Sequence, residues 1–365
     1  MEPMQMHILT AMKIHYFNLP LKNLEDMIEL FITHGADVNF KDSKGSTALY
    51  YAIDIRSIKI MQILIKYGAN IMEKNKYGYT PLHYAAEHNF KEAVEILISL
   101  GANVNEIDAS KNTPLHIAAL KNSLDAAQLL LNSDNINAKN QYGYTALFYT
   151  AGNNNVEFAD YPLSHGADVN LKGLDGRNAL IYYVMQSRYF NANVNVIDLL
   201  ISRGCNMEAK DDYGKTALHY AITTDERLLI TLFIERGANL NSKDNDGKTP
   251  LISAVEKNAE SNINLLITYG ANVNEKNNKG STALHYAANI GSKRIAKNLI
   301  SQGANINERN NLGKTPLHYA DYSYHIDVIE YLISQGADVN AVDNDGVAAL
   351  SYNKRYIQYG RRCTI

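Results

Sequence analysis

Cysteine is nearly absent from this chain of 365 residues, which contains only Cys205 and Cys363. Two cysteines do not form the disulfide framework of a small secreted domain, so an intracellular compartment is expected, the cytoplasm first, with the nucleus or secretion as an effector as alternatives. Asn-x-Ser/Thr glycosylation acceptors are also missing in spite of abundant asparagine, which favours the same location. The N-terminal segment carries Glu2 and lacks a basic start with a long apolar core, so no secretory signal peptide is indicated.

Long apolar runs and an excess of either charge are missing as well. No run approaches the roughly 20 apolar residues that a membrane-spanning helix needs. The formal net charge of -3 provides no basic field for nucleic acid, so neither nucleic acid nor a membrane is expected as a partner. The P-loop, Gly-x-Ser-x-Gly and Cys-x-x-Cys motifs are all missing. We therefore expect no cofactor, no metal site and no enzymatic activity.

What the chain does contain is an internal repeat. A glycine that lies two residues before Thr-Pro-Leu-His, or a close variant, recurs at steps of 33, 33, 32, 33, 38, 33, 33, 33 and 33 residues. A second motif, Gly-Ala-Asp/Asn-x-Asn, runs in parallel from 35–39 to 336–340. One short and one long step therefore mark the third and fifth units as irregular. The recurring positions are Gly45, Gly78, Lys111 (which replaces the glycine), Gly143, Gly176, Gly214, Gly247, Gly280, Gly313 and Gly346.

Each unit has the residues of a short turn–helix–helix motif, as residues 78–105 illustrate. Gly78 permits a turn at positive φ, Thr80 can cap a helix, and the proline after it lies where its missing N–H costs nothing. The spacing of apolar residues predicts a first helix over 82–88 and a second over 91–100, ended by a glycine in the left-handed conformation. Neither helix is long enough to be stable alone in water, so each must pack on the next unit.

This 33-residue unit with its Thr-Pro-Leu-His signature resembles the ankyrin repeat, and the resemblance covers residues 20–353. It implies an all-α solenoid of helix-turn-helix units joined by β-hairpin-like loops. We expect nine repeats in residues 42–342, a degenerate N-terminal capping repeat in 1–41, and a truncated C-terminal repeat with a basic tail in 343–365. We also expect a monomer.

Five histidines recur in register within the signature, which raises the question of a metal site. Equivalent atoms of stacked helices lie about 8–10 Å apart, whereas a metal–nitrogen bond is about 2 Å long, so these histidines cannot share a metal ion. In the ankyrin family this histidine makes structural hydrogen bonds at the start of the first helix, and the resemblance implies that role here. The tyrosine that follows it in most units is expected to pack between repeats. The five histidines are His83, His116, His219, His285 and His318.

A few tyrosines depart from the repeat and are candidates for binding. Residues 76–80 and 141–145 read Lys-Tyr-Gly-Tyr-Thr and Gln-Tyr-Gly-Tyr-Thr, at predicted hairpin tips. In the ankyrin family the tips and the exposed side of the first helices contact partners, and tyrosine is enriched at such contacts. The alternative is that Tyr-Gly-Tyr-Thr is only a favoured hairpin sequence. The expected partner-binding residues are Tyr77, Tyr79, Glu87, His88, Ser110, Asn112, Tyr142, Tyr144 and Tyr213.

The resemblance also implies candidate sites of asparagine hydroxylation. The asparaginyl hydroxylase that acts on ankyrin domains favours the last asparagine of the Gly-Ala-x-x-Asn turn when a leucine lies eight residues upstream. Four asparagines of this sequence fit that pattern, and the alternative is that both residue types are only structural. The four are Asn105, Asn274, Asn307 and Asn340.

Three consecutive units depart from the repeat. The third has Lys111 in place of glycine and residues 132–137 in place of the Gly-Ala turn. The fourth has Pro162 where a leucine of the second helix is expected, and the fifth is about five residues too long within 184–200. These departures are either drift in a redundant array or the mark of a hinge or a specialised site.

The function that the resemblance implies is binding of another protein on the concave ankyrin surface, by shape and a few energetically dominant residues. Two alternatives remain open. A small-molecule or nucleotide sensor would require basic and aromatic residues clustered on neighbouring first helices, and such clustering is weak in this sequence. The chain could also be the ankyrin portion of a larger protein whose activity lies elsewhere.

Overall fold

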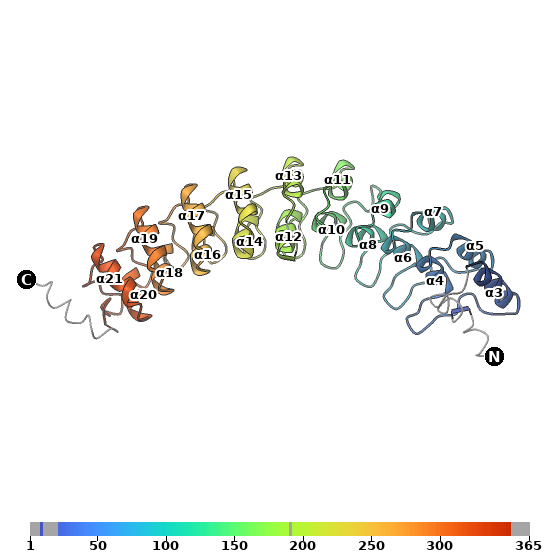
Figure 1. Ribbon diagram of the computed structural model, residues 1–365, viewed down its shortest axis with the longest axis horizontal. Coiled ribbons are helices and arrows are strands. Elements are labelled where there is room, and N and C mark those ends of the chain that lie inside the picture. The colour runs from blue at the N-terminus through green and yellow to red at the C-terminus, as the bar shows by residue number, and fades with distance from the viewer. Residues whose placement is uncertain (1–7, 10–20, 190–191, 352–365) are drawn as a thin grey trace, which may run out of the picture. The chain divides into compact units, whose positions relative to one another are not determined.

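The computed structural model describes residues 8–9, 21–189 and 192–351, which form paired α-helices joined by hairpin-shaped loops (Figure 1). Helix α3, Leu21–Thr33, precedes the pairs, and a 3-10 helix, η1, Ser187–Tyr189, follows α12. The first helices are α4 (Ala48–Asp54), α6 (Pro81–Glu87), α8 (Pro114–Leu120), α10 (Ala146–Gly152), α12 (Ala179–Gln186), α14 (Ala217–Thr224), α16 (Pro250–Glu256), α18 (Ala283–Asn289) and α20 (Pro316–Tyr322). The second helices are α5 (Ile58–Lys66), α7 (Lys91–Ser99), α9 (Leu124–Leu130), α11 (Val156–Ser164), α13 (Val194–Ser202), α15 (Arg227–Glu235), α17 (Glu260–Thr268), α19 (Lys293–Ser301) and α21 (Ile326–Ser334). The expected all-α array of paired helices is confirmed.

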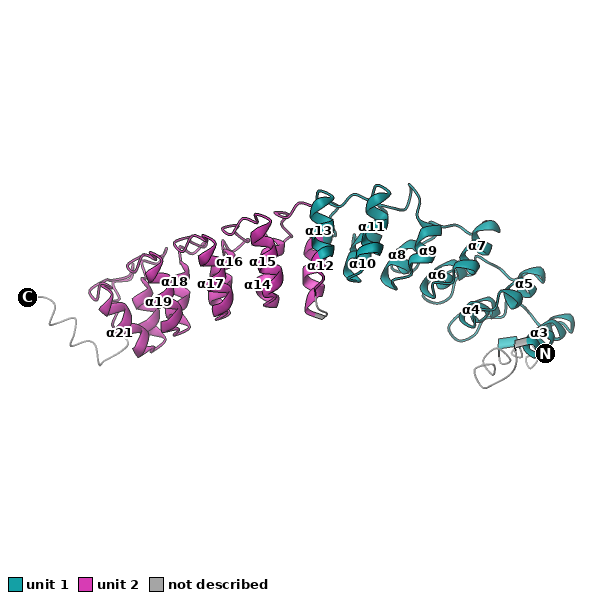
Figure 2. Cartoon of the chain, turned by 45° about the horizontal axis from the view of Figure 1, so that its top comes forward, with its two compact units in different colours: residues 1–179, 195–204 teal, residues 180–194, 205–365 magenta. Residues whose placement is uncertain are grey.

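The chain divides into two compact units (Figure 2). Unit 1 comprises residues 1–179 and 195–204, and unit 2 comprises residues 180–194 and 205–365. Within unit 1 each first helix from α4 to α10 packs on the next, and within unit 2 the same holds from α14 to α20. Since helices in such an array contact mainly their neighbours, stability is a sum of repeat and nearest-neighbour contributions.

A threonine and the signature histidine fix the start of five of the first helices. In α6 the backbone N–H of His83 donates to Thr80 Oγ1, and the backbone N–H of Thr80 donates to His83 Nδ1 at 3.2 Å. The same reciprocal pair begins α8, and in α14, α18 and α20 the backbone N–H of the threonine likewise donates to the histidine Nδ1 at 3.1–3.2 Å. At the other end, Gly101 follows α7 with φ +91°, as expected from the sequence. The structural role expected of the signature histidine is thereby observed.

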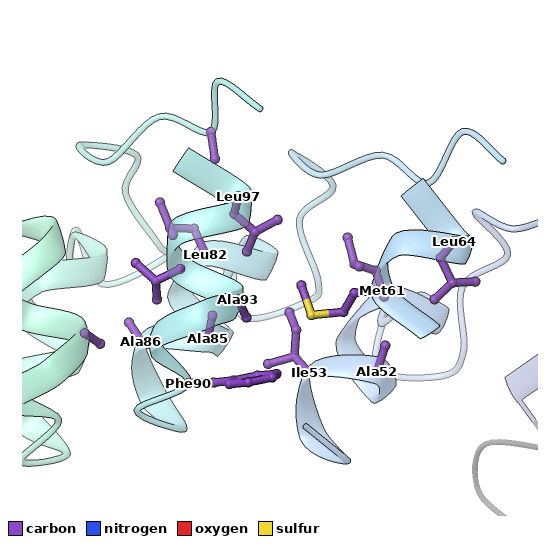
Figure 3. Close-up of a cluster of buried hydrophobic side chains, with 14 of the residues drawn as sticks. Ala52, Ile53, Met61, Leu64, Leu82, Ala85, Ala86, Phe90, Ala93 and Leu97 are labelled. Carbon is purple, nitrogen blue, oxygen red and sulfur yellow. The ribbon is translucent and has the colours of Figure 1, made fainter. Parts of the chain in front are cut away.

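The helices are only seven to nine residues long in most repeats, and burial between them supplies most of their stability. In unit 1, Ile53, Met61, Leu82, Phe90 and Leu97 are at most 3% exposed and form one continuous cluster across the helices α4 to α7 (Figure 3). Alanines at the contact between first helices keep the helices close. Burying each large side chain of this kind contributes about 1.5–3 kcal/mol, more than a short helix gains from its own backbone.

The irregular repeats keep the helix pairs but with local substitutes. Helix α9 ends early, and Asn135, 1% exposed, replaces the Gly-Ala turn by donating from its Nδ2 to the Leu130 carbonyl at 2.8 Å. Pro162 lies inside α11, buried at the position that Leu97 holds in α7. Lys111 takes the left-handed conformation, with φ +61°, where the other tips have glycine.

In the last described segment, a single antiparallel bridge joins Val342 to Ala348 across the tip that begins at Asp343. The basic tail expected after residue 353 lies outside the described residues, as do Cys363 and much of the N-terminal segment. Across 8–9, 21–189 and 192–351, no helix is long and apolar enough to cross a membrane.

Candidate partner-binding surface

Hydrogen bonds of one kind connect the hairpin tips of successive repeats. We number the repeats from the residue that begins each tip, so that repeat 1 begins at Asp42 and repeat 3 at Asp108. Asp42 Oδ1 accepts from the backbone N–H groups of Lys44 and Ser46 at 2.8 and 2.9 Å, which closes the tip. The backbone N–H of Lys76 then donates to the Lys44 carbonyl at 3.0 Å. Equivalent bonds recur in both units and fix the spacing of the tips.

A groove of about 580 Å³ lies between the tips of repeats 1 to 3 and the first helices of repeats 1 and 2, α4 and α6. The structure brings together there five of the residues expected to bind a partner, namely Tyr77, Tyr79, Glu87, Ser110 and Asn112. Tyr77 is 61% exposed and Tyr79 is half-buried. The other residues that give the groove its chemistry are Lys44, Tyr50, Tyr51, Asp54, Lys76, Tyr84 and Asp108.

Three tyrosine hydroxyls of the groove are bonded within the protein. The Tyr50 hydroxyl lies 2.6 Å from the Glu73 carbonyl and 2.5 Å from the Tyr79 carbonyl, and its single proton donates to one of them at a time. Tyr51 donates to Asp42 Oδ2 at 2.6 Å, and Tyr84 lies 3.5 Å from Asp54 Oδ1. The rings of Tyr50 and Tyr84 meet edge to face, with centroids 5.4 Å apart. These contacts hold the rings in place, so that the groove presents preformed aromatic surface.

The groove has a negative interior. Burial raises the pKa of Tyr79 to about 12, and the nearby carboxylates of Glu87 and Asp108 act in the same direction. Burial, the hydrogen bond to Asp42 and the charge of Asp54 raise the pKa of Tyr51. Tyr51 and Tyr79 therefore stay neutral near pH 7, and the charge of the neighbouring carboxylates disfavours a further negative group in the groove.

Glu87 and His88 lie at the end of α6 beside this groove. Glu87 Oε1 accepts from Lys121 Nζ at 2.9 Å. His88 does not line the groove itself, but its ring lies 4.5 Å from the Tyr84 ring and its Nε2 lies 3.7 Å from Asp54 Oδ1. The two residues thus contribute mainly by holding Tyr84 and Asp54 in place and by adding one carboxylate.

The signature histidines use both ring nitrogens inside the array. His83 Nε2 lies 3.0 Å from the Asn112 carbonyl of the next tip, and His285 Nε2 lies 3.1 Å from the Lys314 carbonyl. In repeat 1 the histidine is replaced by Tyr50, whose hydroxyl reaches the Tyr79 carbonyl in the same way. Within the described residues, no group of three or more His, Cys, Asp or Glu side chains could hold a metal ion.

Comparison with known families decides what this array is. A family model described as "Ankyrin repeats (3 copies)" matches residues 21–108, 105–173, 180–277 and 262–343. The chain belongs to the ankyrin-repeat family. The resemblance read from the Thr-Pro-Leu-His signature is thereby confirmed. The matches are to ankyrin repeats, a non-catalytic module that typically binds proteins.

Two curated relatives share parts of this array. The human "Transient receptor potential cation channel subfamily A member 1" is 36% identical over 66 residues, which is 18% of this chain and 6% of that protein. The "Putative ankyrin repeat protein FPV034" of Fowlpox virus (strain NVSL) is 34% identical over 88 residues, 24% of this chain and 19% of that protein. The matched segments span less than a fifth of either relative.

The two tip tyrosines of ankyrin repeat 4 differ from each other. Tyr142 is 55% exposed at the tip. Tyr144 is half-buried, its ring stacks on Phe148 with centroids 4.7 Å apart, and its hydroxyl donates to Asp175 Oδ2 at 2.6 Å. A Cβ at Gly173 would lie 2.4 Å from the Tyr144 ring, so the next tip leaves room for it. Tyr144 therefore has a packing role within unit 1, whereas Tyr142 offers free surface.

The remaining expected tyrosine, Tyr213, lies in unit 2 and is 62% exposed. It borders a smaller groove of about 300 Å³, which is lined by Lys215, Lys248 and Glu256 among others. Lys248 Nζ lies 2.8 Å from Glu256, and Lys215 lies over the Tyr220 ring at 5.8 Å. The residue after the tip glycine is thus a lysine in these two repeats of unit 2, Lys215 and Lys248. The corresponding residues of repeats 2 and 3 are Tyr79 and Asn112.

The candidate hydroxylation sites differ in how their side chains are bonded. Asn274 Oδ1 accepts from the Asn305 backbone N–H at 2.8 Å and its Nδ2 donates to the Gly303 carbonyl. Asn307 makes the equivalent contacts, whereas Asn340 is exposed. Asn105 Oδ1 is buried without a hydrogen-bond partner in the described part of the chain, where the next repeat lacks the Gly-Ala turn. Hydroxylation at all four stays a prediction.

Several groove residues were not identified from the sequence, namely Lys44, Tyr50, Tyr51, Asp54, Lys76, Tyr84 and Asp108. One signal could have found part of this set. Repeat 1 reads Thr-Ala-Leu-Tyr-Tyr, so Tyr50 takes the position that histidine holds in repeats 2, 3, 6, 8 and 9. The contact of Tyr84 with Asp54, 30 positions earlier, has no comparable signal in the sequence.

Proposed function

We propose that this ankyrin-repeat protein binds another protein through the tips of repeats 1 to 3 and the first helices α4 and α6 in unit 1. The observation that carries the proposal is the groove of about 580 Å³ that gathers five of the residues expected to bind a partner, with Tyr77 61% exposed at its rim. Tyrosines with small polar residues beside them are the mixture found at protein interfaces.

The energetics favour a protein over a small ligand. Residues from the tips of three repeats line the groove, and Ser110 stands among its aromatic side chains, where its hydroxyl can bond a partner's backbone. A rigid tyrosine loses little side-chain entropy when it is covered, so a few of them can supply most of the binding free energy. The proposal assigns no catalytic role to this surface.

The test begins with identification of the partner by affinity pull-down and mass spectrometry, followed by binding measurements with purified components. Tyr77→Ala should weaken binding by about 2 kcal/mol or more, a loss of roughly thirtyfold, with the melting temperature unchanged. Tyr213→Ala is the matched control, since Tyr213 occupies the same tip position in unit 2 and is 62% exposed. Tyr79→Ala should weaken binding as well, and Lys314→Ala, at the tip of repeat 9, should not.

If Tyr77→Ala binds like the parent while Tyr213→Ala or Lys314→Ala loses binding, the partner uses unit 2 and the proposal is wrong. Tyr144→Ala is a poorer probe, because loss of its contacts with Phe148 and Asp175 would alter the fold as well as the surface.

Three expectations remain predictions. The cytoplasmic location and the monomeric state come from the sequence alone. The alternative of a larger parent protein also stays a prediction, and a transcript that extends past Ile365 would decide it.

A further inference from the structure

The groove of unit 1 has its negative and positive charges on different sides. Asp108 is 8% exposed, and the side chains of Asp54 and Glu87 are 21% and 25% exposed. Lys44 and Lys76, in contrast, are exposed residues of the tips. Charges in the buried part are screened less by water and salt than charges at the rim. Lys121 already pairs with Glu87 at 2.9 Å, so the negative charge left to attract a cation in the interior is chiefly that of Asp54 and Asp108, with Lys44 and Lys76 at the edge.

Two of these carboxylates stand where the backbone also disfavours them. Asp54 is the last residue of α4 and Glu87 is the last residue of α6. The carbonyl groups at the C-terminal end of a helix carry partial negative charge, so a cation is favoured there and an anion is not. A positive group placed between the two helix ends would be attracted by both carboxylates and by both sets of terminal carbonyls.

The aromatic side chains of the groove offer ring surface more than hydroxyl groups. The hydroxyls of Tyr50, Tyr51 and Tyr84 are directed to acceptors within the protein. What the rings can still give is apolar area and the negative face of their π systems, to which a cation is attracted. A ligand for this groove thus needs an apolar stem and a positively charged head.

We propose that the groove receives an arginine side chain of the protein partner, with its guanidinium group between the ends of α4 and α6. This inference rests on the proposed function and adds the chemistry of the partner. A guanidinium group is planar, stacks on tyrosine rings and donates to carboxylates in pairs, and it is less strongly hydrated than the ammonium group of lysine. Its three-carbon stem would lie against the tyrosine rings.

The experiment uses the full chain with its tyrosine rings labelled for NMR and three small probes. N-acetyl-arginine amide should shift the resonances of Tyr51, Tyr79 and Tyr84 in a saturable way at about 1–10 mM, the range expected for a single anchoring side chain. N-acetyl-citrulline amide has nearly the same shape without the charge and should give no saturable shift. N-acetyl-glutamate amide should give none either.

Variants test the two carboxylates separately. Asp54→Asn keeps an acceptor for the Tyr84 hydroxyl, and Glu87→Gln keeps the size of the side chain while removing its charge and its ion pair with Lys121. Each variant should weaken arginine binding by roughly fivefold or more. The matched control is Glu256→Gln, because Glu256 is likewise the last residue of its first helix, α16, and borders the unit 2 groove. It should leave the arginine titration of the unit 1 tyrosines unchanged.

Three results would overturn the inference: equal shifts with citrulline, binding of the glutamate probe instead of arginine, or no shift with any probe. Binding measurements with the purified partner then test this inference separately from the proposed function. A partner that loses affinity with Tyr77→Ala but binds Asp54→Asn and Glu87→Gln like the parent refutes the arginine site and leaves the proposed function standing. A partner indifferent to all three variants refutes both.

Discussion

The tips of the two units share one backbone and use their side chains differently. In unit 2 the residue after the first tip residue is asparagine in four successive repeats, and each side chain donates to a carbonyl of the preceding tip 33 positions earlier. We call this set, Asn245, Asn278, Asn311 and Asn344, the asparagine ladder. The corresponding side chains of unit 1 make no such bond in the described part of the chain; they are Lys76, Ala109, Gln141 and Leu174.

This difference shows that the same repeat can use its tip side chains either to bond the neighbouring repeat or to present a surface for a partner. The backbone bond between neighbouring tips is present in both units, as from Ala109 to Tyr77 and from Asn278 to Asp246. Unit 2 adds a side-chain bond to each neighbour and sets lysines beside acidic or aromatic partners. Unit 1 has two exposed tyrosines at this tip position, Tyr77 and Tyr142, whereas unit 2 has Tyr213, and the groove of unit 1 is larger than the one beside Tyr213. Side chains that bond the next repeat are not available to a partner, so the two uses compete.

The largest expected difference between the units is in their stability at acid pH. Burial lowers the pKa of His116 and His285 to about 4, and burial also lowers the pKa of the other three signature histidines. The folded-state pKa is then below the unfolded value of about 6.5, so the stability is complete above pH 6.5 and is lost as the pH falls towards 4. Protonation of His116 or of His285 should lower the free energy of unfolding by about 3 kcal/mol as the pH falls from 6.5 to 4.

Unit 2 contains three signature histidines and unit 1 contains two, so unit 2 should lose its amide protection first between pH 6.5 and 4.5. Hydrogen exchange followed by mass spectrometry measures both units in one sample. Equal loss in the two units, or loss confined to pH values below 4.5, would mean that carboxylates and not histidines control acid unfolding.

The second effect concerns Pro162 in unit 1. Its missing N–H removes a hydrogen bond inside α11, which costs up to about 3 kcal/mol. We expect Pro162→Leu to raise the melting temperature, since Leu97 fills the equivalent buried position in α7. In the parent, residues 130–195 should exchange fastest among the internal repeats, because weak repeats destabilise their neighbours.

Pro316→Ala supplies the control in unit 2. Pro316 is the first residue of α20, and alanine occupies that position in α18, so this change should leave the melting temperature nearly unchanged. Uniform protection across all repeats, or a less stable Pro162→Leu variant, would show that α11 is not the weak point.

A smaller effect is expected at Lys111. Its φ of +61° is unfavourable for a residue with a Cβ, so Lys111→Gly should stabilise unit 1 by about 1 kcal/mol in chemical denaturation. In unit 2 the opposite change, Gly280→Ala, should destabilise by more than that. A Cβ at Gly280 would lie 2.8 Å from the backbone nitrogen of Asn311, in addition to the strain of φ +75°. A destabilised Lys111→Gly variant would indicate that the lysine side chain makes a compensating contact.

The smallest effect tests the asparagine ladder itself. Asn278→Ala should cost about 1 kcal/mol, because it removes the bond to the Asn245 carbonyl at 2.7 Å. The reverse change in unit 1, Ala109→Asn, should give a side chain that reaches the Lys76 carbonyl and should add somewhat less than 1 kcal/mol. Urea unfolding of both variants measures the pair. If Ala109→Asn gains nothing while Asn278→Ala loses stability, the tip spacing of unit 1 does not permit the ladder.

The sequence by itself determined the repeat, the helix pairs and most helix ends. Helix α6 begins at Pro81 and α7 ends at Ser99, each one residue from the predicted bounds. These features depend on residues a few positions apart, such as Thr80 with His83, or on the single residue Gly101, and such signals can be read within one unit.

The tertiary structure alone decided which tip residues are free for a partner. Tyr77 and Tyr142 are exposed. Tyr79 and Tyr144 lie in the same Tyr-Gly-Tyr-Thr sequence, but the hydroxyl of Tyr144 is bonded to Asp175 of the next repeat. Likewise Tyr84 reaches back 30 positions to Asp54, which places a carboxylate inside the groove. Each of these contacts joins two residues of neighbouring repeats, about 30 positions apart in the sequence. Neither residue alone predicts the contact. The free energy that selects such a contact arises only once the repeats are stacked.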